Sequence, residues 1–534
     1  RIPPAPGSPR AAGRTMDKER GLIRAAGSMS VMTTLSRIAG YFRDNLQAAI
    51  LGAANSSDAF VIAFRIPNML RRLVGEGALT SAFVPTFARY FKSGDREALW
   101  RFAASVLYAM AAVLAVITAI GIALSPWLVR LLAWGFSVSP EKMALTVSLN
   151  RLMFPYIFFI SLAALAGGIL NAFDVFALPA FTPVLLNLSI ITAAWLLRER
   201  FADPAYGFAV GVIVGGFLQL AVQIPALWGQ GMSLRPPGSF DLDGLREIGR
   251  LILPRVFGVG IIQVNLVIDS QFATSLQSGS VSFLYYANRV TELTLGIFAI
   301  SLSTVILPTL SRATVEQDQE RVRSVLSTAL RLLMFISIPA TIGLIVLRVP
   351  IIQVLFERGR FTHADTLLTA GALAYYAIGL LPYAAVSVLA TAFYAHRDTR
   401  TPVKIGVLTF CLHLALNFAL IGPMKHGGIA LSTSLSALVD GVLLAWFLRR
   451  HAGHFLDRAV ARAAWHTLLA GSAMTAALLF ALRSVDVVAL PGITSRALAL
   501  GGLIAGGGAV YFLALLLLGS QEVRLLASVA RPAR

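Results

Sequence analysis

The sequence has few charged residues and almost no cysteine. Only 13% of its 534 residues are Asp, Glu, Lys or Arg, whereas 57% are hydrophobic. A soluble domain of this size needs far more charge to cover its surface, so the composition excludes a soluble globular protein. Cys411 is the single cysteine, which excludes an intramolecular disulfide and a cysteine-based zinc cluster.

Acidic residues are scarcer than basic ones, and catalytic motifs are missing. The formal net charge is +19, which in a soluble chain would suggest nucleic acid. Here the basic residues cluster between apolar segments, so membrane topology explains them better and no nucleic-acid partner is expected. The sequence has no nucleotide-binding loop, zincin motif, catalytic triad or kinase signature. It therefore predicts neither an enzyme nor an ATP-driven pump.

The sequence is rich in apolar segments of about 20 residues, the length that crosses a bilayer as a helix. We predict an all-α polytopic membrane protein with about 14 transmembrane helices. The predicted spans are 28–52, 57–91, 102–134, 144–172, 178–198, 206–229, 250–277, 280–311, 324–356, 366–394, 402–422, 428–449, 460–482 and 497–519. Residues 1–15 have no apolar core, and we expect a disordered extension or a mis-assigned start.

Lys and Arg are distributed unevenly between alternate connections. One set, which includes both termini, holds roughly 25 of them and the other roughly 9. Because basic residues favour the cytoplasmic side, we expect both termini in the cytoplasm. Arg358 and Arg360 are exceptions, since they fall in a predicted outer connection.

The chain repeats itself at an offset of about 220 residues. Val84 to Arg89 (VPTFAR) returns as Leu307 to Arg312 (LPTLSR), and Pro126 has a counterpart in Pro350. Six spans per copy give both copies the same orientation, so the sequence predicts two six-helix lobes in a parallel pseudo-repeat with a substrate site between them. This is a plan for transport by alternating access. The predicted boundaries are 16–230, 231–450 and a C-terminal helix pair with its tail at 451–534.

Three of the arginines inside predicted spans are the most informative: Arg37 and Arg43 in the first span, and Arg289 in the eighth. An arginine near the bilayer centre costs roughly 2.5–3.5 kcal/mol, so the three together could cost roughly 8–10 kcal/mol. Such residues are tolerated when they face a water-filled cavity or an anionic partner. Because guanidinium groups suit phosphate oxygens, we hypothesise a cavity that binds an anion.

Other charged residues in the same spans have more than one explanation. Several carboxylates can neutralise part of the positive charge. Arg71 and Arg72 fit substrate handling, but they also fit snorkelling at a kink made by Pro67. Arg37 and Arg43 would point about 120° apart on a regular helix, so a bend at Gly40 would be needed to direct both into one cavity.

Two long motifs resemble the MurJ (MviN) family of lipid II flippases, which belongs to the MOP exporter superfamily. They are Ser36 to Asp44 (SRIAGYFRD) and Ser57 to Arg72 (SDAFVIAFRIPNMLRR), and Tyr285 to Arg289 (YYANR) continues the match. The resemblance extends from about Met16 to the C-terminus. It implies a flippase in peptidoglycan biosynthesis that moves lipid II to the periplasmic leaflet of the bacterial inner (plasma) membrane. It also implies lipid II or a related polyprenyl-diphosphate glycolipid, membrane lipids and the cell-wall synthesis machinery as partners.

The resemblance also assigns roles to residues. Those implied to bind substrate are Arg37, Arg43, Arg289, Asp58, Asn68, Arg71 and Arg72, and those implied in gating or charge pairing are Asp44, Glu76 and Glu292. The last two helices would form a groove for the lipid tail. Some members bind sodium, and Asp269 and Asn417 match two of the ligand positions. The family has a carboxylate one turn after the position of Asn417, but this sequence has Ile421 there. We therefore expect no cofactor, and a sodium ion is the one candidate if any is bound.

Three other functions remain open from the residues alone. A flippase for another polyprenyl-linked saccharide would share the same physics. A MATE-type antiporter for drugs or cations would favour an acidic rather than a basic interior. A membrane enzyme acting on polyprenyl phosphates would need clustered Asp or His residues at a membrane face, and the sequence shows no such cluster.

Overall fold

The structure, a computed structural model, describes residues 9–72, 80–233 and 235–530. Side chains are described for 27–72, 82–233, 235–252, 263–296 and 306–525. Every regular element in these parts of the chain is helical, which confirms the all-α class. The chain divides into two compact units, Arg1–Ser275 and Leu276–Arg534, and each is described by itself.

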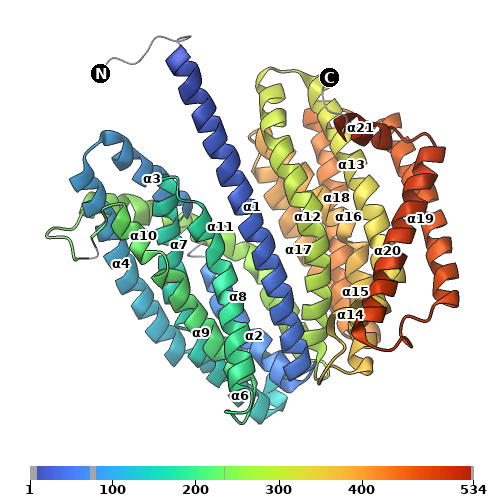
Figure 1. The fold of residues 1–534 in the computed structure, drawn as a ribbon, viewed down its shortest axis with the longest axis horizontal. Coiled ribbons are helices and arrows are strands. Elements are labelled where there is room, and N and C mark those ends of the chain that lie inside the picture. Colours follow the sequence, from blue (N-terminus) through green and yellow to red (C-terminus); the bar gives the residue numbers. More distant parts are fainter. Residues whose placement is uncertain (1–8, 73–79, 234, 531–534) are drawn as a thin grey trace. The chain divides into compact units, whose positions relative to one another are not determined.

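The first unit contains eleven α-helices and one short 3-10 helix within its described residues (Figure 1). They are α1 (Pro9–Leu51), α2 (Asn55–Arg71), α3 (Thr80–Ser93), α4 (Arg96–Ala123), α5 (Ser125–Leu132), η2 (Trp134–Val138), α6 (Pro140–Met153), α7 (Tyr156–Ala172), α8 (Ala177–Leu197), α9 (Ala205–Ala221), α10 (Ile224–Gly229) and α11 (Leu242–Thr274). Because α1 begins at Pro9, residues 9–15 are helical, where a disordered extension was expected; residues 1–8 lie outside the described part.

The second unit contains ten α-helices within its described residues, including the red pair α19 and α20 in Figure 1. They are α12 (Ser280–Val315), α13 (Gln319–Val346), α14 (Arg348–Phe356), α15 (His363–Ile378), α16 (Leu380–Ala395), α17 (Arg400–Met424), α18 (His426–Ala452), α19 (Arg458–Ser484), α20 (Ile493–Leu517) and α21 (Gln521–Ala530). The predicted C-terminal pair corresponds to α19 and α20, which pack on each other and on α13.

Two apolar cores hold the first unit together. In one, Phe60 of α2, Tyr156 of α7 and Phe208 of α9 are buried together with the end of α1. In the other, Phe83, Phe87 and neighbouring side chains of α3 pack against α4, α7 and α11. Helix α8 packs on both α1 and α9. This packing fixes α1 and α2, which carry the first group of predicted site residues.

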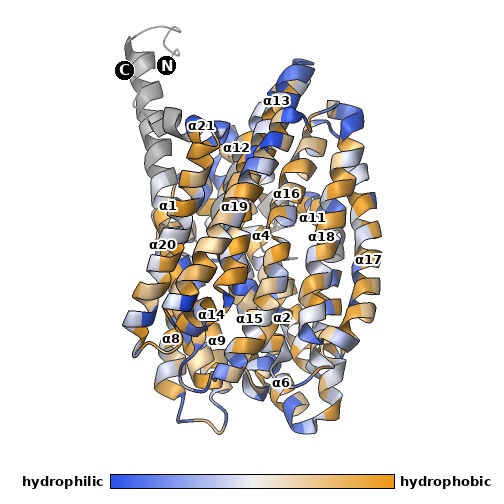
Figure 2. Cartoon of the chain, turned by 90° about the vertical axis from the view of Figure 1, so that its right-hand side faces the viewer, coloured by the Kyte–Doolittle hydropathy of each residue, from blue (hydrophilic) through white to orange (hydrophobic). Residues whose placement is uncertain are grey.

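The described residues of the second unit include a large apolar core, and its helices are apolar on the outside as well. Leu326 of α13, Phe393 of α16 and Leu448 of α18 are among its fully buried residues. Figure 2 shows hydrophobic residues along most of the length of α17 and α19, with hydrophilic residues gathered near helix ends. An apolar surface on helices with apolar cores is expected of a protein that lipid surrounds.

Ten helical segments in the described parts are long and apolar enough to span a membrane. They are Arg96–Ala123, Pro140–Ala172, Ala177–Leu197, Ala205–Gly229, Gln319–Val346, His363–Ala395, Arg400–Met424, His426–Ala452, Arg458–Ser484 and Ile493–Leu517. The four other predicted spans, near α1, α2 with α3, α11 and α12, are not among these ten segments, and parts of three of them lie outside the residues whose side chains are described. These four carry nearly all the predicted site residues. The number fourteen therefore stays a prediction.

Several predicted spans are divided into two helices. Helix α4 ends before Leu124 and α5 continues beyond it, and α13 and α14 are divided in the same way at Leu347. Pro126 lies at the start of α5 and Pro350 lies in α14. Proline lacks the N–H that would continue the preceding helix, so the repeated prolines explain a break that hydropathy alone did not reveal.

The backbone supports the repeat. Asp95 caps α4 and Asp318 caps α13, each accepting a hydrogen bond from a backbone N–H three residues later. After α7 and α16 the chain turns through positive φ at Asp174 (61°) and Arg397 (60°). All these positions keep the same order in both copies.

Along the sequence, however, the boundary between the two compact units differs from the predicted lobe boundary at residue 230. Helix α11 belongs to the first unit, which ends at Ser275. The N–H of Trp134 donates to Oε1 of Gln271 (3.0 Å), and the Gln271 amide donates to the carbonyl of Leu131. A Cβ on Gly135 would lie 2.2 Å from the carbonyl oxygen of Thr274. These contacts hold the end of α11 against α5 and η2.

Candidate functional site

Arg43 of α1 is held by two side chains in the first unit. Its Nε and Nη2 donate to Oδ1 of Asp44 (3.1 and 2.7 Å), and its Nη1 donates to Oδ1 of Asn187 on α8 (3.0 Å). The Asn187 amide in turn donates to the backbone carbonyl of Ser36 (3.2 Å). The side chains of Arg43 and Asp44 are 12% and 8% exposed. Asp44 thus forms a largely buried ion pair with Arg43, and its role in gating or charge pairing stays a prediction.

Gly40 is the point where α8 approaches α1. A Cβ on Gly40 would lie 3.6 Å from the Asn187 amide nitrogen. Helix α1 continues without interruption from Pro9 to Leu51 through Gly40. Arg37 is exposed, whereas Arg43 is largely covered. This difference is expected from two residues about 120° apart on a continuous helix.

Asp58, near the start of α2, forms a buried ion pair with Lys142 of α6. Lys142 Nζ donates to Asp58 Oδ2 at 2.7 Å, and the two side chains are 7% and 1% exposed. The Lys142 ammonium also lies 4.2 Å from the ring centroid of Phe136. Close by, Asn150 of α6 donates to the carbonyl of Ala63 on α2 (2.9 Å). The ion pair therefore joins α2 to α6 and is shielded from water.

The other end of α2 carries a second polar group. Arg65 Nη1 donates to Ser270 Oγ of α11 (2.5 Å), and Arg71 Nε donates to Asn68 Oδ1 (3.0 Å). Arg72 is exposed. Glu76 lies outside the described residues, so its predicted gating role stays a prediction.

Arg289 lies on a polar face of α12 in the second unit. Its Nη1 donates to Glu292 Oε2 (3.1 Å), and its guanidinium carbon lies 5.1 Å from the ring centroid of Tyr285. Asn288 donates to the other carboxylate oxygen of Glu292 (3.0 Å). The Arg289 side chain is 37% exposed. Arg289 thus combines a carboxylate partner with partial access to solvent.

The two residues matched to sodium ligands lie in different units. Asp269 is partly buried on α11. Asn417 is fully buried on α17, where its Oδ1 accepts from Ser432 and its Nδ2 contacts His413 Nε2 at 3.1 Å. Among the described residues, no group of three or more His, Cys, Asp or Glu could hold a metal ion.

Comparison with known proteins identifies the family. A family model described as "Lipid II flippase MurJ" matches residues 47–505. The chain belongs to the MurJ family of lipid II flippases. It is 37% identical over 505 residues to "Probable lipid II flippase MurJ" of Vibrio cholerae, covering 93% of this chain and 96% of that protein.

Comparison with solved structures supports the assignment to the MurJ family. The structure titled "Lipid II flippase MurJ, inward closed conformation" has a TM-score of 0.74 and 27% identity, covering 93% of this chain and 99% of its own. An inward-facing multidrug resistance MATE family transporter of the MOP superfamily has a TM-score of 0.64 at 16% identity, covering 81% of this chain and 98% of its own. At that identity the MATE likeness shows a shared fold only.

The structure also identifies partners of MurJ-motif residues that the sequence analysis did not name: Asn187, Lys142 and Ser270. Asn187 lies four residues after Pro183 in an otherwise apolar segment, and Lys142 is the third residue of α6, two positions after Pro140. A polar residue inside an apolar span is a signal that could have been followed. Their pairing with Arg43, Asp58 and Arg65 depends on packing between distant segments.

Proposed function

We propose that this protein is a flippase that moves lipid II, an undecaprenyl-diphosphate-linked peptidoglycan precursor, from the cytoplasmic to the periplasmic leaflet. The observation that carries the proposal is the placement of Arg43 and Arg289. Each lies in a helix matching a MurJ motif, and each is held by a carboxylate that an anionic ligand can replace. Membership of the MurJ family supports the same substrate class.

In this mechanism Arg37, Arg43 and Arg289 bind the diphosphate in an inward-open, water-filled cavity. The sugars and peptide occupy the hydrated space, and the polyprenyl chain stays in lipid beside the last two helices. Substrate neutralises the arginines and allows closure on the cytoplasmic side. Asp44, Glu76 and Glu292 re-pair with the arginines once the headgroup leaves.

Flipping forms and breaks no covalent bond, so the protein is not an enzyme in this proposal. Both termini lie in the cytoplasm. A membrane potential that is negative inside favours export of an anion, and two charges that cross fully would gain roughly 4.6 kcal/mol at 100 mV. The potential therefore supplies a driving force that needs no nucleotide.

We further propose that transport does not depend on bound sodium, because the residues of α17 do not suit that ion. A sodium site needs several oxygen ligands. The Oδ1 atom of Asn417 already accepts a hydrogen bond from Ser432, and Ile421 offers no oxygen on its side chain.

Replacement of Arg289 tests the proposed substrate site. Arg289→Ala should abolish flipping of lipid II by reconstituted protein at normal protein levels, and Arg289→Lys should restore it only partly because the guanidinium fork is lost. Arg198→Gln is a matched control, since Arg198 is exposed and pairs only weakly with Glu199. Normal flipping by Arg289→Ala would refute this site.

Depletion in cells distinguishes the substrates. If the proposal is correct, depletion causes lipid II to accumulate in the cytoplasmic leaflet. Accumulation of a different polyprenyl-linked saccharide would instead favour the alternative flippase. Loss of drug efflux without any accumulated glycolipid would favour a MATE-type antiporter.

A further inference from the structure

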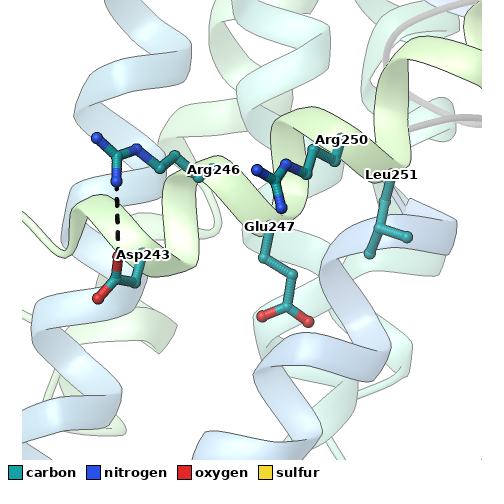
Figure 3. Close-up of a pocket in the computed structure, with 5 residues that line it drawn as sticks. All are labelled: Asp243, Arg246, Glu247, Arg250 and Leu251. Carbon is teal, nitrogen blue, oxygen red and sulfur yellow. Dashed lines mark ion pairs between the residues drawn. The ribbon is translucent and has the colours of Figure 1, made fainter.

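The first three turns of α11 carry a basic pocket in the first unit. A cavity of about 400 Å³ is lined by Asp243, Arg246, Glu247, Arg250 and Leu251 (Figure 3). This volume lies in the range of small-molecule sites. None of these residues has a role in the proposed flipping mechanism, so the pocket calls for a separate explanation.

The pocket stands on a firmly held segment. Asp241 caps α11 by accepting from the N–H of Gly244 (2.9 Å), and it also accepts from the hydroxyl of Tyr90 on α3 (2.7 Å). The N–H of Asp241 donates to Ser105 Oγ of α4 (2.9 Å). A Cβ on Gly244 would lie 2.6 Å from the ring of Phe102, so α11 packs closely against α4. The lining side chains therefore project from a fixed backbone.

The carboxylates that line the pocket form no close ion pair with its two arginines. Glu247 is paired with Arg89 of α3. Arg246 reaches Asp243 only at 4.0 Å, and the two side chains are 75% and 97% exposed, so this pair contributes little stability. No ion pair joins Arg250 to any residue for which side chains are described. In Figure 3 a dashed line marks the long contact between Arg246 and Asp243, and no such line joins Arg250 to Glu247.

Exposed apolar side chains lie on the same segment as the two arginines, and Leu251 also lines the pocket. Leu242 is 61% exposed, Phe240 48% and Leu251 37%. Two guanidinium groups one helical turn apart can bind phosphate oxygens, and exposed apolar side chains beside them can contact acyl chains. This combination is typical of the headgroup region of a membrane, where basic pockets bind anionic lipids.

We propose that this pocket binds the phosphate group of an anionic phospholipid, with Arg246 and Arg250 as ligands and Leu242 and Leu251 against the acyl chains. Inorganic phosphate shares the headgroup's chemistry, but it would gain nothing from the exposed leucines. The bound lipid holds the first turns of α11, the helix whose Ser270 contacts Arg65 of α2. The site thus couples lipid composition to the position of α11.

Thermal unfolding of the purified full-length protein in detergent tests this site. Phosphatidylglycerol should raise the unfolding temperature of the wild type by about 3–6 °C, and phosphatidylcholine should leave it unchanged. The increase should fall by more than half in Arg246→Gln/Arg250→Gln and persist in the control Arg198→Gln. Because both pocket arginines are exposed, the double variant should fold normally without added lipid.

Two results would overturn the proposal. An equal increase with inorganic phosphate at the same concentration would make the pocket a free phosphate site. An unchanged response to phosphatidylglycerol in the double variant would place the lipid elsewhere. The number of phosphatidylglycerol molecules retained in native mass spectrometry, measured for Arg250→Gln alone, gives a second readout that does not depend on unfolding. A count equal to that of the wild type would also contradict the assignment.

Discussion

The buried ion pair between Asp58 and Lys142 offers a way to test whether Asp58 has a structural role or acts on the substrate. Lys142 Nζ and Asp58 Oδ2 are 2.7 Å apart, and both side chains are more than 90% buried. Breaking a buried ion pair by removing one partner costs about 3–5 kcal/mol, whereas replacing both partners by neutral residues is often nearly neutral. We therefore expect Lys142→Met and Asp58→Asn each to destabilise the protein, and the double variant to recover most of the loss.

A double-mutant cycle measures this coupling. The unfolding free energy of the wild type, the two single variants and the double variant should give an interaction energy of about 3 kcal/mol, or roughly a hundredfold in the equilibrium constant. Flipping by each reconstituted variant is measured in parallel. If the pair only joins α2 to α6, activity should recover together with stability in the double variant.

The opposite outcome would refute this interpretation. A double variant that unfolds at the wild-type temperature but does not flip lipid II would mean that the Asp58 carboxylate itself acts on the substrate, as the MurJ resemblance implies. A Phe136→Leu variant serves as a control. It removes the ring beneath Lys142 while keeping the ion pair, and should cost only about 1–2 kcal/mol.

Three further outcomes are expected. Gly135→Ala should lower the unfolding free energy by about 1–3 kcal/mol, because its Cβ would clash with the carbonyl of Thr274; a variant as stable as the wild type would contradict the packing of α11. Partial burial raises the pKa of Glu357, but hydrogen bonds from three neighbouring side chains outweigh it and hold that pKa below its usual 4.5. Its contribution to stability is therefore present above pH 4.5 and lost as pH falls through the lowered pKa, so Glu357→Gln should flatten the acid limb of a stability–pH curve. Replacing sodium by potassium should leave the rate of flipping unchanged, and a large drop would show that sodium is needed.

Much of the fold could be predicted from local patterns. Apolar segments of bilayer length predicted helices that the structure contains, since length and hydropathy are properties of a short stretch of chain. The break at Leu124 and its counterpart at Leu347 were missed because hydropathy averages over the prolines that cause them. The charged spans carrying Arg43 and Arg289 were recognised by their motifs.

The candidate site was only half predictable. The sequence indicated which arginines are costly in a membrane, because that cost depends on the residue and its surrounding segment. It did not indicate that Asn187 contacts Arg43, or that Lys142 neutralises Asp58. These contacts join residues more than 80 positions apart. Such pairing depends on which helix faces are brought together, so it cannot be predicted from the sequence of a single span.

By itself, the sequence determined that this is a helical membrane protein with basic residues inside its spans and a repeated plan. Hydropathy, charge and the spacing of prolines are properties of short stretches of chain, and they can therefore be recognised from the sequence alone. Only the tertiary structure decided that α11 packs with the first unit, because the contacts of Gln271 and Gly135 arise from segments that meet only after folding. It also decided which charges are paired, since an ion pair requires two side chains within a few ångströms of each other.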